Sequence, residues 1–187
     1  VPASRPLNGR DGFLFTLLVP DRARLLFPSF DQPDIKGQFS LVLEIPSSGV
    51  AVSNSVKISE QEVAPGRVKV SFGTTEELST YLFSFVAGHF HVEEFRRGKR
   101  SISIYHREND PKKIKQLPDI AGEVFDALEF LEEYTAIPYP FGKYDLIILP
   151  GFQYGGMEHT GATLYNDTRM FLNEQATLAE RLARSSL

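Results

Sequence analysis

The chain of 187 residues is long enough for one full domain or two small ones. Its 42% hydrophobic and 24% charged residues are ordinary for a globular protein, and no run approaches the ~18 consecutive apolar residues of a membrane-spanning helix. The 20 basic and 24 acidic residues give a net charge of -4, which argues against nucleic acid or an anionic lipid surface as a partner. Cysteine is absent, which excludes disulfides and thiolate-held metals but leaves the compartment open, with cytoplasm and periplasm both compatible.

The first part of the chain has the pattern of short strands. Residues 12–19 are apolar and end at Pro20, and residues 38–46 alternate between apolar and polar side chains, as in a half-buried strand. Further strands are expected at residues 50–53, 55–58, 67–72 and 79–87. Strands at this spacing predict an antiparallel β-domain. Residues 88–100 then indicate a turn region, followed by one more strand at 100–106.

The second part changes character, because helical spacing replaces the alternation. Residues 119–135 place Ile120, Val124, Leu128 and Leu131 on one face, with Asp119 as the expected N-cap. Residues 174–187 predict the opening turns of another helix. The expected fold class is therefore α+β, with a β-rich domain at residues 1–92 and a second domain at residues 93–187. Because the chain starts without methionine and its last helix ends without a capping residue, we expect truncation at both ends.

Several charged groups could carry chemistry but have simpler explanations. His89 and His91 would lie on the same side of a strand at a spacing that can hold zinc, although no further ligand is obvious and a hydrogen-bonded or solvated role is favoured. The basic run at residues 96–100 is better explained by a solvated hairpin than by a phosphate site. The solvent-facing side of the 119–135 helix is expected to hold Glu129, Glu132 and Glu133.

The best candidate site follows an apolar run at residues 146–149 and a Pro150-Gly151 break. It places the acid Glu158 beside the glycines Gly155 and Gly156, which allow another backbone to approach closely. A structural alternative is a strand whose small residues pack against the helix and whose glutamate forms a salt bridge. The sequence contains neither the pattern of a serine nucleophile elbow nor that of a phosphate-binding glycine loop.

Two motifs resemble those of the aminopeptidase N and leukotriene hydrolase family. The first is similar to the family signature Phe-Pro-Cys-Phe-Asp-Glu-Pro and comprises Phe27, Pro28, Ser29, Phe30, Asp31, Gln32 and Pro33. The second is similar to the exopeptidase motif Gly-Ala-Met-Glu-Asn and comprises Gly155, Gly156, Met157, Glu158 and His159. Residues 81–90 and 137–149 also fit the family pattern, so the resemblance covers nearly the whole chain. The departures are Ser29 for cysteine, Gln32 for glutamate, His159 for asparagine and, where many relatives have a second amine-binding residue, Val19.

The resemblance implies a zinc aminopeptidase in which a saddle-like β-domain leads into the beginning of a thermolysin-like catalytic domain. Residues 155–159 would bind the peptide substrate, with the Glu158 carboxylate pairing with its free α-amine and the Gly155-Gly156 backbone pairing with its extended chain. None of the four histidines begins the family's His-Glu-x-x-His zinc motif, so we expect no metal in this chain and no activity from it alone. By resemblance, the first zinc ligand should follow Leu187 within about one helical turn. The alternative is a family member that lost the zinc motif and serves as an interaction scaffold.

Overall fold

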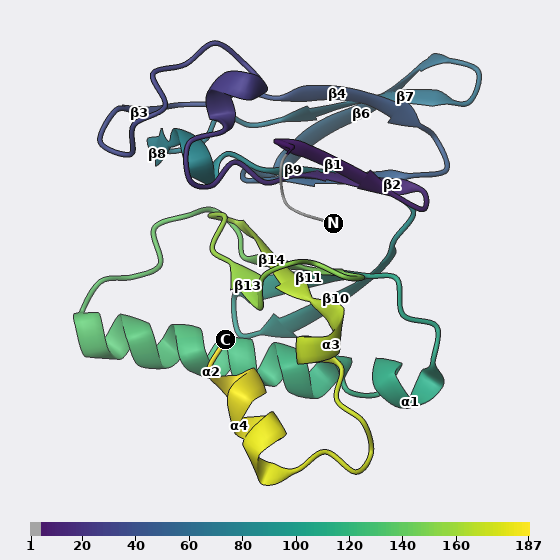
Figure 1. Ribbon diagram of the computed structural model, residues 1–187, viewed down its shortest axis with the longest axis vertical. Coiled ribbons are helices and arrows are strands. Elements are labelled where there is room, and N and C mark those ends of the chain that lie inside the picture. The colour runs from purple at the N-terminus through teal and green to yellow at the C-terminus, as the bar shows by residue number, and fades with distance from the viewer. Residues whose placement is uncertain (1–4) are drawn as a thin grey trace. The chain divides into compact units, whose positions relative to one another are not determined.

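The computed structural model describes residues 5–187 and divides them into two compact units (Figure 1). The N-terminal unit contains the described residues up to Phe90 together with residues 158–162. The C-terminal unit contains residues 91–157 and 163–187. The α+β class predicted from the sequence is confirmed, because a mostly β region is accompanied by a few helices. Among residues 5–187, no helix combines the length and the apolar character required to cross a membrane.

The N-terminal unit consists of antiparallel strands and two short 3-10 helices. One sheet has the order β1-β2-β9-β5, a second has the order β4-β7-β6, and β3 pairs with β8. The strands are β1 (Leu7–Arg10), β2 (Phe13–Thr16), β3 (Lys36–Gly37), β4 (Val42–Pro46), β5 (Val50–Ser53), β6 (Lys57–Ala64), β7 (Arg67–Phe72), β8 (Leu78–Ser79) and β9 (Phe85–Gly88). The 3-10 helices are η1 (Ala23–Leu25) and η2 (Thr80–Leu82).

The two larger sheets of this unit form layers that share one core (Figure 1). Ile45 and Val70 of one sheet are buried in the same cluster as Ala87 of the other. Alternation along β4 explains this arrangement, since every second side chain of a strand faces the same layer. A second cluster is aromatic, with the rings of Phe39 and Phe83 4.9 Å apart between centroids. This cluster holds the segment between β8 and β9, where the site described below is anchored.

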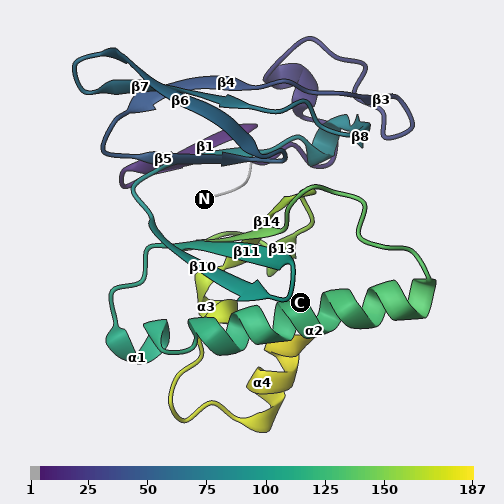
Figure 2. The same cartoon turned by 180° about the vertical axis from the view of Figure 1, so that it is seen from behind.

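The C-terminal unit contains a five-stranded sheet of order β10-β11-β12-β14-β13. Its strands are β10 (His91–Arg97), β11 (Arg100–His106), β12 (Asp145–Leu149), β13 (Gly156–Met157) and β14 (Ala162–Asn166). Its helices are α1 (Pro111–Ile114), α2 (Leu117–Thr135), α3 (Asp167–Met170) and α4 (Leu178–Ser185). Strands β11 and β12 are parallel, and α2 connects them across the sheet (Figure 2).

Helix α2 forms because its apolar residues recur on one face and bury against this sheet. Ile120, Phe125 and Leu128 lie in the core with Ile102 and Ile104 of β11. The predicted N-cap was wrong, since the helix begins at Leu117 and Asp119 lies in its first turn, where a carboxylate favours the helix dipole. Leu131 was also expected to be buried, but it is 52% exposed.

Three predictions of strand extent were wrong. The expected strand at 79–87 is interrupted by η2, so that its strand part is β9. The expected turn region at 88–100 contains β10, which pairs along its whole length with β11. The hairpin turn is confined to Gly98 and Lys99, and Gly98 has φ of +59°. The charged side chains of β10 obscured a strand whose Phe95 packs on the core. Strand β6 is longer than the expected segment 55–58 and lies at a sheet edge, where polar side chains remain solvated.

Candidate functional site

The candidate site begins at the edge of the C-terminal sheet. The apolar run predicted at residues 146–149 is confirmed as part of β12, whose residues are all buried. The chain then turns at Gly151, which has φ of +65°, and enters β13. Within the described residues 5–187, strand β13 pairs only with β14, with Gly156 opposite Tyr165 and Met157 opposite Leu164. It is therefore an edge strand, with one side of its backbone open to further pairing.

Gly156 of this strand and Gly155 just before it also lie where a side chain would meet a neighbour. A side chain at Gly156 would place its first carbon 3.1 Å from the ring of Tyr165, which is closer than ordinary packing allows. At Gly155 the same atom would meet the side chain of Leu187 at 2.9 Å. Part of the glycine pattern therefore serves packing within the C-terminal unit, although the contacts are with Tyr165 and Leu187 and not with the helix that the structural alternative named.

Glu158 is the exposed acid of the segment and belongs to the N-terminal unit. Within residues 5–187 its carboxylate forms no hydrogen bond or ion pair, so the salt bridge of the structural alternative is absent. Its neighbours Met157 and His159 are buried, whereas the Glu158 carboxylate is exposed and therefore available to an external cation.

His159 is the opposite case, because its side chain is fully buried. Burial penalises the charged imidazolium and lowers the pKa of His159 from 6.5 to about 3. The ring is therefore neutral at physiological pH. The backbone carbonyl of His159 accepts a hydrogen bond of 3.1 Å from the Ala162 N–H, which closes a tight turn. Gly161 has φ of +72° in this turn, the conformation that a type II turn needs at its third residue.

Asn54 holds this turn, a role that no sequence pattern predicted. Its side-chain amide donates to the backbone carbonyls of Leu82 and Thr160, each at 2.9 Å. Its carbonyl oxygen accepts from the Ser84 N–H at 2.7 Å. A lone asparagine after a strand has no local pattern that would indicate this role, because its partners lie 28 to 106 residues away.

The first motif of the resemblance is a packed loop of the N-terminal unit. Asp31 accepts hydrogen bonds from the Thr80 hydroxyl at 2.7 Å and from the Arg24 N–H at 3.1 Å. The Phe27 ring packs against Phe39 and Phe83 of the aromatic cluster. The substitutions at Ser29 and Gln32 leave these contacts in place.

His89 and His91 were predicted to lie on the same side of one strand, but they do not share a strand. His89 follows the end of β9, and its ring is 3.1 Å from the Ser48 carbonyl. His91 opens β10, where its ring is 3.2 Å from the Asn109 side chain. Among residues 5–187, no group of three or more histidine or acidic side chains is arranged to hold a metal ion. The described residues therefore do not fit a zinc site.

The basic run at 96–100 and the acids of α2 meet each other. Arg97 pairs with Asp126 at 2.5 Å, and Arg100 pairs with Glu132 at 2.6 Å. Glu132 also accepts the Tyr139 N–H at 2.6 Å, so the prediction that it only faces solvent was wrong. The Arg100 hydrogen bond, followed by the Tyr139 N–H, lowers the pKa of Glu132.

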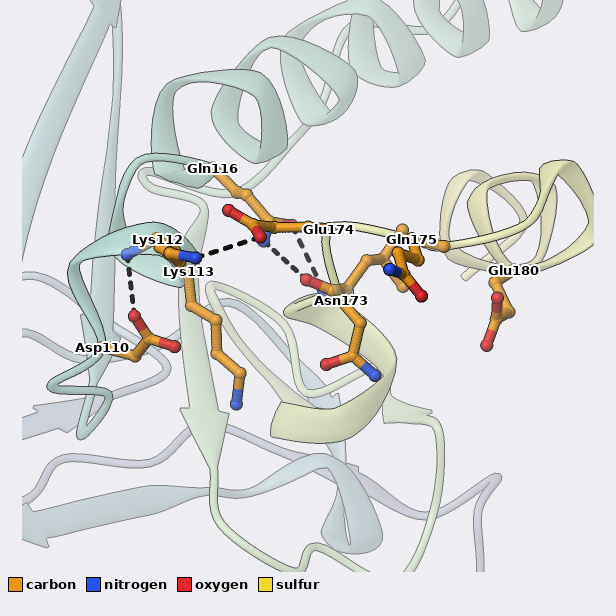
Figure 3. A pocket seen from close by; sticks show the side chains of 10 residues that line it. Asp110, Lys112, Lys113, Gln116, Asn173, Glu174, Gln175 and Glu180 are labelled. Atoms are coloured by element: carbon orange, nitrogen blue, oxygen red, sulfur yellow. Dashed lines mark hydrogen bonds and ion pairs between the residues drawn. The ribbon is translucent and has the colours of Figure 1, made fainter.

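A polar hollow of about 430 Å³ lies in the C-terminal unit near α1 and the segment before α4 (Figure 3). Several of its charged and amide groups bind one another or the nearby backbone. Lys112 pairs with Glu174 at 3.0 Å, and the Gln116 amide exchanges two hydrogen bonds with the backbone of Leu172 (Figure 3). These contacts indicate a structural role for the residues around the hollow, because they fix the segment leading into α4.

Comparison with known proteins identifies relatives of both parts of the chain. Residues 6–82 match the Peptidase M1 N-terminal domain, and residues 121–186 match the Peptidase family M1 domain. The chain is 33% identical over 165 residues to human (Homo sapiens) endoplasmic reticulum aminopeptidase 1, covering 88% of the chain and 17% of that protein. It is also 33% identical over 177 residues to human endoplasmic reticulum aminopeptidase 2, covering 94% of the chain and 18% of that protein.

A plant relative gives the same result. Aminopeptidase M1-A of Oryza sativa subsp. japonica is 33% identical over 181 residues, covering 95% of the chain and 20% of that protein. The chain thus spans about a fifth of the length of these curated relatives. The resemblance stated from the two sequence motifs is confirmed, and the chain belongs to peptidase family M1, whose N-terminal part it matches.

Proposed function

We propose that this chain is the N-terminal part of a zinc metallo-aminopeptidase that removes N-terminal residues from peptides. In this proposal, residues 155–159 bind the N-terminal end of the substrate. One observation carries it: Glu158, inside the motif that resembles the family's exopeptidase sequence, is exposed and has no partner among residues 5–187. The names of the relatives, which are aminopeptidases, support the same reading.

The chemistry of a peptide N-terminus suits an unpaired carboxylate. A free α-amine has a pKa of about 8 and is largely cationic at neutral pH. A carboxylate forms a charge-assisted hydrogen bond with such a cation, stronger than a bond between neutral groups. The pairing fixes where the substrate chain begins and so restricts cleavage to its end. A blocked or internal peptide group lacks this charge and gains nothing from Glu158.

The backbone beside Glu158 offers a second set of contacts. Strand β13 is a sheet edge, and an extended peptide can pair with such an edge as an added strand. Gly155 and Gly156 have no side chains to obstruct this pairing. Met157 and His159 complete the proposed binding segment, with the buried Met157 and His159 side chains holding it in place.

The metal belongs to another part of the proposed enzyme. The described residues do not fit a zinc site, and by resemblance the His-Glu-x-x-His ligands would follow Leu187. We therefore propose that residues 1–92 form the saddle-like β-domain and that residues 93–187 begin the thermolysin-like catalytic domain. We expect the 187-residue chain alone to be inactive.

The test is Glu158→Ala in the full-length protein, measured on peptides with a free amine. We expect kcat/KM to fall by the equivalent of roughly 2 to 5 kcal/mol, as for the loss of one partner of a desolvated charge pair, with the zinc content unchanged. Glu133→Ala is the matched control, because Glu133 is another acid of the chain and lies on α2. Unchanged kinetics for Glu158→Ala would exclude the amine anchor. A full-length protein without zinc or peptidase activity would instead favour the interaction scaffold.

A further inference from the structure

Asn54 connects the chain just after Glu158 to the core of the N-terminal unit. The Asn54 side chain is 7% exposed, and both of its N–H groups are used on backbone carbonyls of separate segments, at Leu82 and Thr160. A third, longer contact of 3.4 Å joins the amide to the Thr160 hydroxyl. The oxygen of the amide faces the Ser84 N–H. A flipped amide would direct its oxygen at two carbonyls, so this network fixes the orientation of the side chain.

The other end of the Asn54 contact is rigid. Leu82 and Ser84 flank Phe83, which is 6% exposed and packs in the aromatic cluster with Phe27 and Phe39. Ser53, the neighbour of Asn54 and the last residue of β5, donates its hydroxyl to the Ser84 carbonyl at 2.7 Å. Thr160 is therefore tied through Asn54 to a part of the fold that has little room to move.

The segment between Thr160 and Glu158 is also constrained. His159 lies between them with its side chain fully buried, and the turn from His159 to Ala162 is closed by a backbone hydrogen bond. Two residues of chain span at most about 7 Å, so a shift of Thr160 passes directly to the backbone of Glu158. The Glu158 carboxylate is exposed, and nothing else among residues 5–187 holds it.

We propose that Asn54 is the positioning residue of Glu158: its amide fixes Thr160 and so sets where the amine-binding carboxylate stands. This inference rests on the proposed function, because it gives Glu158 the role of amine anchor. Asparagine suits the role, since an aspartate has no donor for the two carbonyls and a serine has only one. The β-domain thus contributes to substrate positioning through a side chain that does not touch the substrate.

The experiment uses the full-length protein with Asn54→Asp and Asn54→Ser. The serine variant covers the case in which a buried aspartate prevents folding, and far-UV circular dichroism and zinc content check both. Ser53→Ala is the matched control, because it removes a buried hydrogen bond to the carbonyl of Ser84, the residue whose N–H donates to Asn54, without touching Thr160. Hydrogen exchange is followed in peptides that cover residues 158–162 and, for comparison, β12.

We expect the Asn54 variants to raise exchange at residues 158–162 but not in β12, and to lower kcat/KM on free-amine peptides by roughly tenfold to a hundredfold, as for a misplacement of about 1 Å. In a Glu158→Gln background the same variants should cause no further loss of kcat/KM, because the group they position has lost its charge. A merely structural role would lower kcat/KM equally in both backgrounds.

The outcomes separate this inference from the proposed function. If Glu158→Gln lowers kcat/KM but the Asn54 variants change neither exchange nor kcat/KM, the positioning role is refuted and the amine anchor stands. An equal loss in both backgrounds also refutes it. If Glu158→Gln leaves kcat/KM unchanged, the amine anchor fails and this inference fails with it, whatever the exchange at residues 158–162.

Discussion

His159 should make the chain less stable in mild acid, and Asn is the informative replacement because an asparagine occupies this position in the family motif. The ring is fully buried, and its pKa falls from 6.5 to about 3 because burial disfavours the charged form. The unfolded chain therefore binds a proton on His159 at a higher pH than the native chain does. The stabilising contribution is complete above the unfolded pKa and is lost as the pH falls from 6.5 towards 3.

The magnitude follows from the size of the shift. Each pKa unit corresponds to about 1.4 kcal/mol, so at about pH 5, some 1.5 units below the unfolded pKa, His159 should cost about 2 kcal/mol of unfolding free energy. At about pH 4 the cost should exceed ~3 kcal/mol. His106, whose pKa is also lowered by burial and then by the nearby His91, adds to the acid sensitivity of both proteins equally.

Urea unfolding followed by circular dichroism measures this effect on the chain and on His159→Asn at about pH 8 and about pH 5. Replacing a buried ring changes the packing by an amount that does not depend on pH. The quantity to compare is therefore the difference between the two proteins at each pH. We expect His159→Asn to gain about 2 kcal/mol relative to the original chain on going to the lower pH. A difference that stays constant within about 0.5 kcal/mol would refute the buried neutral imidazole.

Two further predictions concern the C-terminal unit. Arg184 of α4 pairs with Glu123 of α2 and donates to Gln116 at 3.2 Å; the Arg184 side chain is 10% exposed and that of Glu123 is 35% exposed. Glu123→Gln should lower the unfolding free energy by about 1 to 2 kcal/mol, a value discounted for the partial exposure of Glu123. A loss below about 0.5 kcal/mol in urea unfolding would count against a stabilising role of the pair. Gly156→Ala should cost about 1 to 3 kcal/mol by crowding the Tyr165 ring, while Gly142→Ala, whose added carbon meets nothing within 4 Å, should be nearly neutral. Equal melting temperatures for the two alanine variants would contradict the crowding argument.

Local patterns predicted the elements whose residues alternate or recur without interruption. The alternation near residues 42–46 gave β4, and the helical spacing of Ile120 and Leu128 gave α2. Strand β10 was missed because most of its side chains are charged and pair with α2 or face solvent. Its apolar residues are Val92, which is exposed, and Phe95, which packs on the core. Strand β10 is stabilised by its pairing with β11, and the residues of β10 alone do not indicate that pairing.

The candidate site also has a part that the sequence predicted and a part that it did not. The exposed Glu158 was found because its neighbours form a recognisable motif, and its role as amine anchor remains a prediction. The burial of His159 and the contacts of Asn54 depend on residues far away in sequence, and composition or spacing carries no trace of them. Tertiary hydrogen bonds of single polar side chains are therefore the part of this site that only the structure reveals.

The assignment of residues 158–162 to the N-terminal unit has a practical consequence for dividing the protein. A truncation after Phe90 would keep Asn54 but remove the carbonyl of Thr160, leaving a buried donor without an acceptor at a cost of about 1 to 3 kcal/mol. Exchanging this β-domain between two members of peptidase family M1 by one crossover would create the same mismatch. A chimaera that respects the fold needs two donated segments, the strands up to Phe90 and the five residues that begin with Glu158.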